Sequence, residues 1–266
     1  SSADRVNAPC KLCMNKDIAP FDQRALASYF STFLVIGHRG AAGLAPENTL
    51  PSFRRALDIG CQGIELDVHA VNDATGEQQL VVIHDDTVDR TTNGQGPVSR
   101  HTAEHIAELD AGDGNRIPRL AEVTALVARH IADTRPLINI ELKGKGTAAP
   151  TAIFLRAHPG FAVLVSSFNH DELAAFRKWD ETTPVAPLFE RVRGNMLETA
   201  TKLGASCINL SNRMAKAPVI EQCSEAGFPV LVYTVNQLHD AQRLKAMGVA
   251  GVFTDRPDRL ITVSAR

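Results

Sequence analysis

The sequence predicts an α/β protein with a TIM-type (β/α)8 barrel in a single domain, and three observations support this prediction. The chain has 266 residues, and such a barrel commonly uses about 250. From Arg119 onward, stretches with helical periodicity alternate with short, continuous apolar runs, which is typical of parallel strands buried on both faces. Polar or charged residues end most of these runs. A barrel brings such strand ends around one mouth, whereas an open, doubly wound sheet, the alternative fold, spreads them along an edge.

Nine apolar runs are candidate strands, one more than an eight-stranded barrel needs, so we expect one of them to be peripheral or not a strand. Residues 69–78, between the second and third runs, are too few for a crossover helix, which leaves a hairpin or a loop crossover at that point. The nine runs are residues 33–36, 63–68, 79–85, 137–142, 162–166, 185–189, 207–210, 230–235 and 251–254.

Two parts of the chain fall outside the regular alternation. Residues 1–32 contain two prolines, mixed polar residues and a short helix-like patch at 23–30. We expect them to form an N-terminal extension, to which we assign no function, before a barrel domain of residues 33–264. Residues 87–118 form a long irregular loop rich in turn residues. A loop of this length beside a reactive strand end is either a lid or a plain surface excursion.

Composition and charge exclude several classes of partner. The net charge of −2 gives no basic excess for a nucleic-acid backbone, and no apolar run approaches the about 18 residues that span a bilayer. We therefore expect no nucleic-acid partner and no stable membrane insertion. The N-terminus lacks the basic region and apolar core of a signal peptide, so a cytoplasmic location is expected, although a signal removed before residue 1 is compatible with the sequence. The sequence does not indicate an oligomeric state.

The five cysteines cannot all pair with one another, because their number is odd. Cys61, Cys207 and Cys223 lie in apolar or helical contexts, where a buried free thiol is the ordinary interpretation. Cys10 and Cys13 form a C-x-x-C, but no second such pair and no H-x-x-x-H completes a zinc site, and no βαβ pattern surrounds them. The favoured interpretation gives this pair no metal or redox role.

Residues 34–49 open the domain with a strand, a loop of reactive side chains and the start of a helix. Glycines bracket His38 and Arg39, where the backbone must bend tightly or approach a ligand closely. Asn48 or Thr49 is the expected N-cap of the helix that follows. The stretch predicts a strand end that carries functional side chains.

Acidic residues lie two positions apart at the end of the second strand. Glu65 and Asp67 leave the same face of that strand, about 7 Å apart along it, and Glu141 and Lys143 repeat the spacing. Carboxylates pointing into an apolar barrel cannot all stay charged and unpaired. One divalent cation resolves the conflict, and an all-oxygen ligand set favours Ca²⁺ or Mg²⁺ over zinc. The alternative is a purely structural network with Lys143 and Arg39.

Two histidines end different strands of the predicted barrel. His38 and His84 are placed to give and take a proton near neutral pH, which allows acid and base roles on opposite sides of a reacting centre. Arg39 and Lys143 add fixed positive charge, which suits an anionic oxygen such as that of a phosphate group. A divalent cation, two cationic side chains and two histidines together predict a phosphodiester-cleaving site.

Ten short motifs in this order resemble those of the glycerophosphodiester phosphodiesterase family. They extend from residue 38 to residue 257, nearly the whole chain, and their order and spacing make the resemblance specific. The motifs are His38-Arg-Gly40, Pro46-Glu-Asn-Thr49, Glu65-Leu-Asp-Val68, His84-Asp85, Thr92-Asn-Gly94, Ile117-Pro118, Glu141-Leu-Lys143, Ser167-Phe168, Tyr233-Thr-Val-Asn236 and Thr254-Asp-Arg-Pro257.

The resemblance implies a TIM-type barrel of the phospholipase C-like class and assigns a role to each candidate residue. It implies that Phe168 and Tyr233 line the pocket for the alcohol, where many members carry Trp in place of Tyr233. The remaining implied roles are acid and base for His38 and His84, ligands of Ca²⁺ or Mg²⁺ for Glu65, Asp67 and Glu141, and contact with the phosphate for Arg39 and Lys143.

The function expected from these observations is metal-dependent hydrolysis of a small glycerophosphodiester to glycerol 3-phosphate and an alcohol. Two alternatives stay open. One is a lysophospholipase D or phospholipase C-like enzyme that acts on lipids, and the other is a non-catalytic barrel that binds phosphodiesters. The sequence does not identify the alcohol, choose between Ca²⁺ and Mg²⁺, or say which histidine is the acid.

Overall fold

The computed structural model of the protein describes residues 18–131, 134–191 and 195–264. Cys10 and Cys13 lie outside these residues. The three cysteines within them are buried free thiols, as predicted: Cys61, Cys207 and Cys223.

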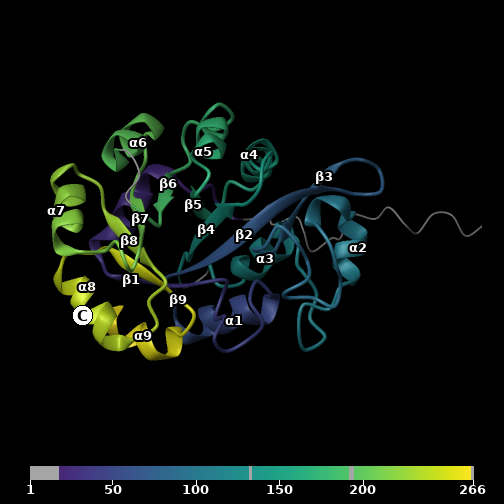
Figure 1. Cartoon of the computed structure of the whole chain (residues 1–266), viewed down its shortest axis with the longest axis horizontal. Helices are drawn as coiled ribbons and strands as arrows, with labels where there is room; N and C mark the ends of the chain where they lie inside the picture. The colour runs from purple at the N-terminus through teal and green to yellow at the C-terminus, as the bar shows by residue number, and fades with distance from the viewer. Residues whose placement is uncertain (1–17, 132–133, 192–194, 265–266) are drawn as a thin grey trace, which may run out of the picture.

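The prediction of a TIM-type barrel is confirmed. Eight strands in the described part of the chain form the ring: β1 (Leu34–Gly37), β2 (Gly63–Asn72), β4 (Leu137–Leu142), β5 (Ala162–Ser167), β6 (Val185–Phe189), β7 (Ile208–Ser211), β8 (Val230–Tyr233) and β9 (Gly251–Thr254). Neighbouring strands are parallel, and β1 pairs with β2 on one side and with β9 on the other, which closes the ring (Figure 1).

The ninth predicted strand is peripheral. β3 (Gln78–Val82) pairs antiparallel with the outer part of β2 and lies outside the ring. β2 continues past Val68, its last residue to pair with β4, and a tight turn at 73–77 returns the chain as β3. The connection is a hairpin because it is too short for a crossover helix. The returning strand brings His84 to the mouth of the barrel, where the N–H of Ile83 donates to the carbonyl of Asp67 at 3.1 Å.

Helices cover the outside of the ring (Figure 1). Ile138 and Ile140 of β4 pack outward into the main apolar cluster between strands and helices, whereas Leu137 belongs to the cluster inside the ring, as the two-residue period of a strand requires. Within the described residues, every helix falls short of the length and apolar character of a membrane span. The outer helices are α1 (Leu50–Ile59), α3 (Leu120–Ala128), α4 (Ala148–Ala157), α5 (His170–Arg177), α6 (Met196–Leu203), α7 (Ala217–Glu225), α8 (Leu238–Ala246) and α9 (Pro257–Ser264).

The long segment 87–118 is compact and has an apolar cluster of its own. It contains the 3-10 helix η2 (Val98–Arg100) and the short helix α2 (Ala103–Glu108), which lies beside β3 in Figure 1. Val88 and Ile106 are fully buried and pack with residues of the β2–β3 hairpin. The segment is therefore fixed against the barrel next to the end of β3.

The 3-10 helix η1 (Gln23–Ser31) contributes to the core inside the barrel. Leu26 is 1% exposed and packs in the interior cluster with Leu34 and Leu137. The amide of Gln23 donates to the carbonyl of Phe161 at 2.8 Å, at the start of β5. The last part of the predicted extension thus closes the end of the barrel opposite the mouth.

Substitution Leu26→Ala is expected to lower the free energy of unfolding by about 2–4 kcal/mol, because it removes a fully buried side chain and leaves a cavity. Equilibrium unfolding in urea measures this loss. Ser28→Ala, at an exposed position of the same helix, is the control and should leave the unfolding curve unchanged. A Leu26→Ala curve that overlays the wild-type curve would show that η1 does not close the barrel.

Candidate active site

The loop between β1 and α1 places two polar side chains through unusual backbone angles. Arg39 and Asn48 both have positive φ, at 50° and 57°. Thr49 occupies the N-cap position of α1, whereas the side chain of Asn48 donates to Oδ2 of Asp67 at 2.9 Å. Thr49 is therefore the N-cap residue, and the side chain of Asn48 binds a carboxylate of the cluster. A Cβ at Gly40, where φ is 84°, would collide with the start of α1, so this loop needs glycine there.

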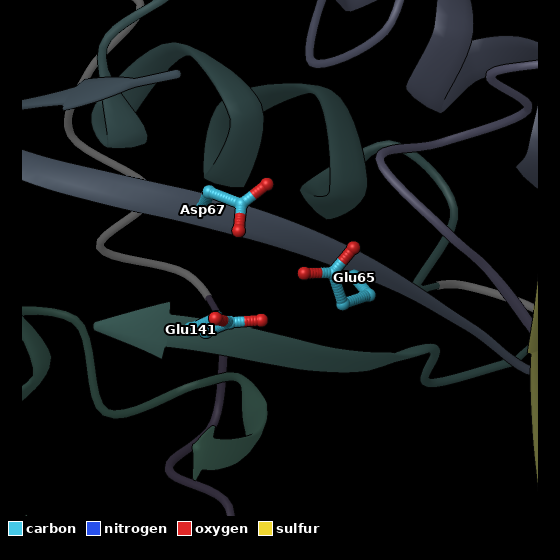
Figure 2. A group of neighbouring side chains, drawn as sticks. All are labelled: Glu65, Asp67 and Glu141. Atoms are coloured by element: carbon cyan, nitrogen blue, oxygen red, sulfur yellow. The ribbon is translucent and has the colours of Figure 1, made fainter. Parts of the chain in front are cut away.

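The three predicted metal ligands lie together at the mouth of the barrel (Figure 2). In the register of β2 and β4, Asp67 lies opposite Glu141, and Glu65 precedes Asp67 on the same face. One carboxylate oxygen from each residue lies within 4.8 Å of the others, and all three residues are buried. Such a set of oxygen donors is the size and chemistry that a hard divalent cation uses.

Each of these carboxylates has one oxygen held by a protein donor. The backbone N–H of Arg39 donates to Oε2 of Glu65 at 2.8 Å, and Lys143 donates to Oε1 of Glu141 at 3.0 Å. Oε1 of Glu65 and Oδ1 of Asp67 are buried and have no hydrogen-bond partner among the described residues. Unsatisfied buried carboxylate oxygens are costly, so the two unpartnered atoms fit a bound cation.

The electrostatics of the cluster favour the same interpretation. Burial, followed by the charges of Asp67 and Glu141, raises the pKa of Glu65 well above its usual value. Burial and the charge of Asp67 raise the pKa of Glu141 to about 7, although Lys143 opposes this shift. The structural network of the alternative is partly present, since Arg39 lies 3.6 Å from Asp67. This network leaves Oε1 of Glu65 and Oδ1 of Asp67 without partners, and a divalent cation would satisfy both atoms.

His38, which follows β1, is oriented by a carboxylate that follows the neighbouring strand β9. Its Nδ1 lies 2.7 Å from Oδ1 of Asp255, which follows β9, and the amide of Asn236 donates to Oδ2 of the same carboxylate at 3.0 Å. The other ring nitrogen, Nε2, lies 4.0 Å from Oε2 of Glu65. With Nδ1 bound to Asp255, Nε2 is the atom that His38 presents to the cluster.

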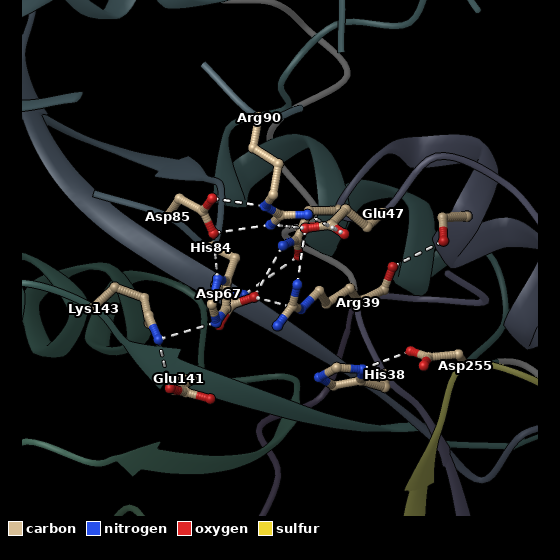
Figure 3. A network of polar contacts seen from close by, with 12 residues as sticks. His38, Arg39, Glu47, Asp67, His84, Asp85, Arg90, Glu141, Lys143 and Asp255 are labelled. Atoms are coloured by element: carbon tan, nitrogen blue, oxygen red, sulfur yellow. Dashed lines mark hydrogen bonds and ion pairs between the residues drawn. The ribbon is translucent and has the colours of Figure 1, made fainter. Parts of the chain in front are cut away.

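His84 is held in the same way from the end of β3 (Figure 3). Its Nδ1 lies 2.6 Å from Oδ1 of Asp85, and Nζ of Lys143 lies 3.3 Å from its Nε2. Burial lowers the pKa of His84, despite the opposing charge of Asp67 and the hydrogen bond to Asp85. A neutral ring then presents an unprotonated Nε2. His69, which sequence alone did not assign, is buried behind it with Nε2 3.3 Å from the carbonyl of His84.

A cavity of about 150 Å³ opens beside these groups. Phe168 and Tyr233 line it together with both histidines, and their rings meet edge to face with centroids 5.7 Å apart. Nζ of Lys143 lies 5.8 Å from the centre of the Phe168 ring. The structure thus brings all nine predicted site residues into one region: His38, Arg39, Glu65, Asp67, His84, Glu141, Lys143, Phe168 and Tyr233.

Sequence reasoning gave no role to several residues that hold this site. Asp255, Asn236 and Asp85 lie within motifs quoted for the resemblance, but spacing along the chain does not reveal which side chain each one contacts. Glu47 accepts from Arg39 at 2.9 Å, and Arg90 contacts both Glu47 and Asp85. Only the position of Asp85 directly after His84 offered a usable signal.

Comparison with known proteins agrees with this geometry. The model of the glycerophosphoryl diester phosphodiesterase family matches residues 38–259. The chain belongs to this family. It is 36% identical over 243 residues to a glycerophosphodiester phosphodiesterase of Caldanaerobacter subterraneus subsp. tengcongensis, covering 86% of this chain and 97% of that protein. The resemblance seen in the motifs is therefore confirmed, and the family is one of hydrolases.

Solved structures of relatives share the fold. A phosphodiesterase from Oleispira antarctica, in complex with the product sn-glycerol-3-phosphate, aligns with a TM-score of 0.80 at 27% identity, over 88% of this chain and 98% of that one. A glycerophosphodiester phosphodiesterase from Agrobacterium tumefaciens aligns with a TM-score of 0.71 at 31% identity, over 85% of this chain and 97% of that one. Both are matched over nearly their whole length.

The carboxylate cluster predicts a pH-dependent gain of stability from added cation. The pKa values of Glu65 and Glu141 are raised by folding, so the folded, metal-free protein holds more protons than the unfolded chain. Its stability should fall as pH rises from about 4.5, the ordinary value for Glu, through about 7. Because a cation binds the ionised form, the increase in melting temperature on adding Ca²⁺ or Mg²⁺ should grow over the same range.

Melting temperatures between pH 5 and pH 8, with EDTA or with cation, measure this effect. Glu141→Gln removes one of the mutually repelling carboxylates. In EDTA, its melting temperature should therefore fall less between pH 5 and pH 8 than that of the wild type. An increase on adding cation that is independent of pH in the wild type would contradict the proposed ligand set.

Proposed function

We propose that the protein hydrolyses glycerophosphodiesters to glycerol 3-phosphate and an alcohol, in a reaction that depends on one divalent cation, Ca²⁺ or Mg²⁺. The observation that carries this proposal is the pair of unpartnered, buried carboxylate oxygens on Glu65 and Asp67, flanked by two histidines that are each oriented by a carboxylate. Membership of the family supports it, as does the product bound to the relative from Oleispira antarctica.

Glu65, Asp67 and Glu141 are the residues that would hold the cation. When bound, the cation would supply Lewis-acid stabilisation of the phosphoryl group as negative charge develops in the transition state. Arg39 and Lys143 lie at the same cluster and add positive charge for the phosphodiester anion. Their own charge is partly neutralised by Asp67 and Glu141, so the phosphate would complete a balanced set of charges.

His38 and His84 would move the protons of the reaction. Each has Nδ1 tied to a carboxylate, so the acting atom is Nε2 in both. One Nε2 would accept the proton of the attacking hydroxyl as its oxygen bonds to phosphorus, and the other would protonate the departing alkoxide as its P–O bond breaks. Attack by water gives glycerol 3-phosphate directly, whereas attack by the glycerol hydroxyl gives a cyclic phosphate that a water molecule must then open to glycerol 3-phosphate. The carboxylates of Asp255 and Asp85 stabilise the imidazolium form that the accepting ring passes through.

Phe168 and Tyr233 would receive the alcohol. Phe168 is 43% exposed, so its ring forms part of the opening of the cavity. Because Lys143 lies near its face, the apolar wall would lie beside the proposed phosphate position. A small alcohol attached to the phosphate would therefore lie against these two rings while the phosphate meets the cation cluster.

Turnover of glycerophosphocholine should be lost in EDTA and restored by Ca²⁺ or Mg²⁺. Variants His38→Ala and His84→Ala should each lose about 10²–10⁴-fold in kcat, since each removes one proton-transfer group. His239→Ala, at an exposed surface position, is the control and should keep wild-type activity. Activity that survives both chelation and His38→Ala would reject the proposed mechanism.

A panel of glycerophosphodiesters, compared with micellar lysophospholipids and followed by phosphorus NMR, tests the substrate class. Glycerol 3-phosphate from water-soluble diesters is the expected product. Turnover confined to micellar lipid, or a cyclic phosphate as final product, would instead favour the lipid-directed activities. Binding without turnover across the whole panel would identify a non-catalytic barrel.

A further inference from the structure

Arg90 makes two forked contacts at the edge of the site (Figure 3). Its Nε and Nη2 donate to the two oxygens of Asp85 at 2.7 and 2.8 Å. Its Nη1 and Nη2 donate to the two oxygens of Glu47 at 3.1 and 2.8 Å. One planar guanidinium therefore bridges two carboxylates, which the single point charge of a lysine cannot do with the same geometry.

Each of these carboxylates in turn holds a residue of the proposed machinery. Asp85 accepts from Nδ1 of His84 at 2.6 Å, and Glu47 accepts from Arg39 at 2.9 Å. Arg90 thus connects the orientation of a proton-transfer group with that of a phosphate-binding group, although these two residues come from different strand ends. Its own guanidinium contacts neither of them in the described structure.

Hydrogen bonds and a buried side chain hold the turn that carries Arg90. The N–H of Val88 donates to the carbonyl of Gly96 at 3.0 Å, and Oδ2 of Asp89 accepts from the N–H of Gly96 at 2.8 Å. Val88 is fully buried in the apolar cluster of segment 87–118. On the other side of Arg90, Oγ1 of Thr92 donates to the carbonyl of Val88 at 2.6 Å, so contacts hold the turn both before and after Arg90.

The charges of the network agree with this arrangement. Hydrogen bonding by Arg90, followed by that of His84, lowers the pKa of Asp85 against the effect of burial. Burial would raise the pKa of Glu47, but Arg90 and Arg39 outweigh it and the pKa is lowered. Both carboxylates are thus ionised acceptors, and the ring of His84 must donate from Nδ1, which leaves Nε2 facing the cavity.

We infer that Arg90 is a positioning residue, which fixes the ring of His84 through Asp85 and the guanidinium of Arg39 through Glu47. This inference rests on the proposed function, since it concerns the same site. It also gives segment 87–118 a function beyond that of a surface excursion, because this segment supplies Arg90. An exposed ion pair contributes little to stability by itself, and the side chain of Arg90 is 49% exposed; its contribution lies in orientation.

Proton NMR of Arg90→Ala tests the inference, with two variants that assign the resonances and one control. In the wild type, the Nδ1 protons of His84 and His38, each on a short hydrogen bond to a carboxylate, should give two slowly exchanging downfield resonances. Asp85→Asn and Asp255→Asn assign them. Arg90→Ala should remove or broaden the His84 resonance and leave that of His38, which Arg90 does not contact. Arg100→Ala, exposed on the same segment, should leave both resonances unchanged.

Kinetics on glycerophosphocholine supply the second measurement. Arg90→Ala should lower kcat about tenfold to a hundredfold, as loss of an orienting partner commonly does, while the affinity for the cation stays at the wild-type value. Arg90→Lys should recover only a small part of kcat, because lysine cannot form both forks. Arg100→Ala should match the wild type.

The two proposals fail in different ways. An inactive wild type would reject the proposed function, whereas the NMR spectra would still decide whether Arg90 holds His84. An active wild type with Arg90→Ala within threefold in kcat and both resonances intact would overturn the role of Arg90. Loss of both resonances in Arg90→Ala would also overturn it, since that result indicates a general disturbance of the mouth.

Discussion

The burial of three carboxylates at one end of a closed barrel is the constraint on which the rest of the site depends. The pairing of β2 with β4 sets Asp67 opposite Glu141, and the two-residue period of a strand adds Glu65 to the same face. Carboxylates so close in an apolar interior repel one another and resist ionisation. The fold therefore favours whatever positive charge can enter the cluster, and the side chains that surround it supply only part of that charge.

The surrounding residues bind and orient without filling the cluster. Donors from the β1–α1 loop and from Lys143 each hold one oxygen of a carboxylate, while the remaining oxygens of Glu65 and Asp67 stay unpartnered. Carboxylates after β3 and β9 bind Nδ1 of His84 and of His38, which leaves Nε2 of each ring facing the cluster. These partners come from separate strand ends that only ring closure brings together. The site is thus a property of the whole barrel, and segment 87–118 belongs to it through Arg90.

The sequence was sufficient for those features that follow from local periodicity. Apolar runs located the eight strands of the barrel, and the polar residues that end them located the mouth, including His84 on a hairpin strand that returns to it. Contacts between loops were not predictable, because spacing does not determine which carboxylates meet Arg90, or that Asp255 meets His38. Asn48 looked like a helix cap, but its left-handed backbone turns the side chain toward Asp67. The burial of Leu26 could not be predicted from its short, mixed segment, because Leu26 is buried only by packing against the interior of the closed barrel.

The central claim is that one cation completes the carboxylate cluster, and anomalous diffraction from a crystal grown with Mn²⁺ tests it most directly. Mn²⁺ shares the preference of Ca²⁺ and Mg²⁺ for oxygen ligands. The account predicts one strong peak at about 2.0–2.6 Å from an oxygen of each of Glu65, Asp67 and Glu141. A crystal with no peak there, in which Arg39 and Lys143 alone neutralise the three carboxylates, would contradict it.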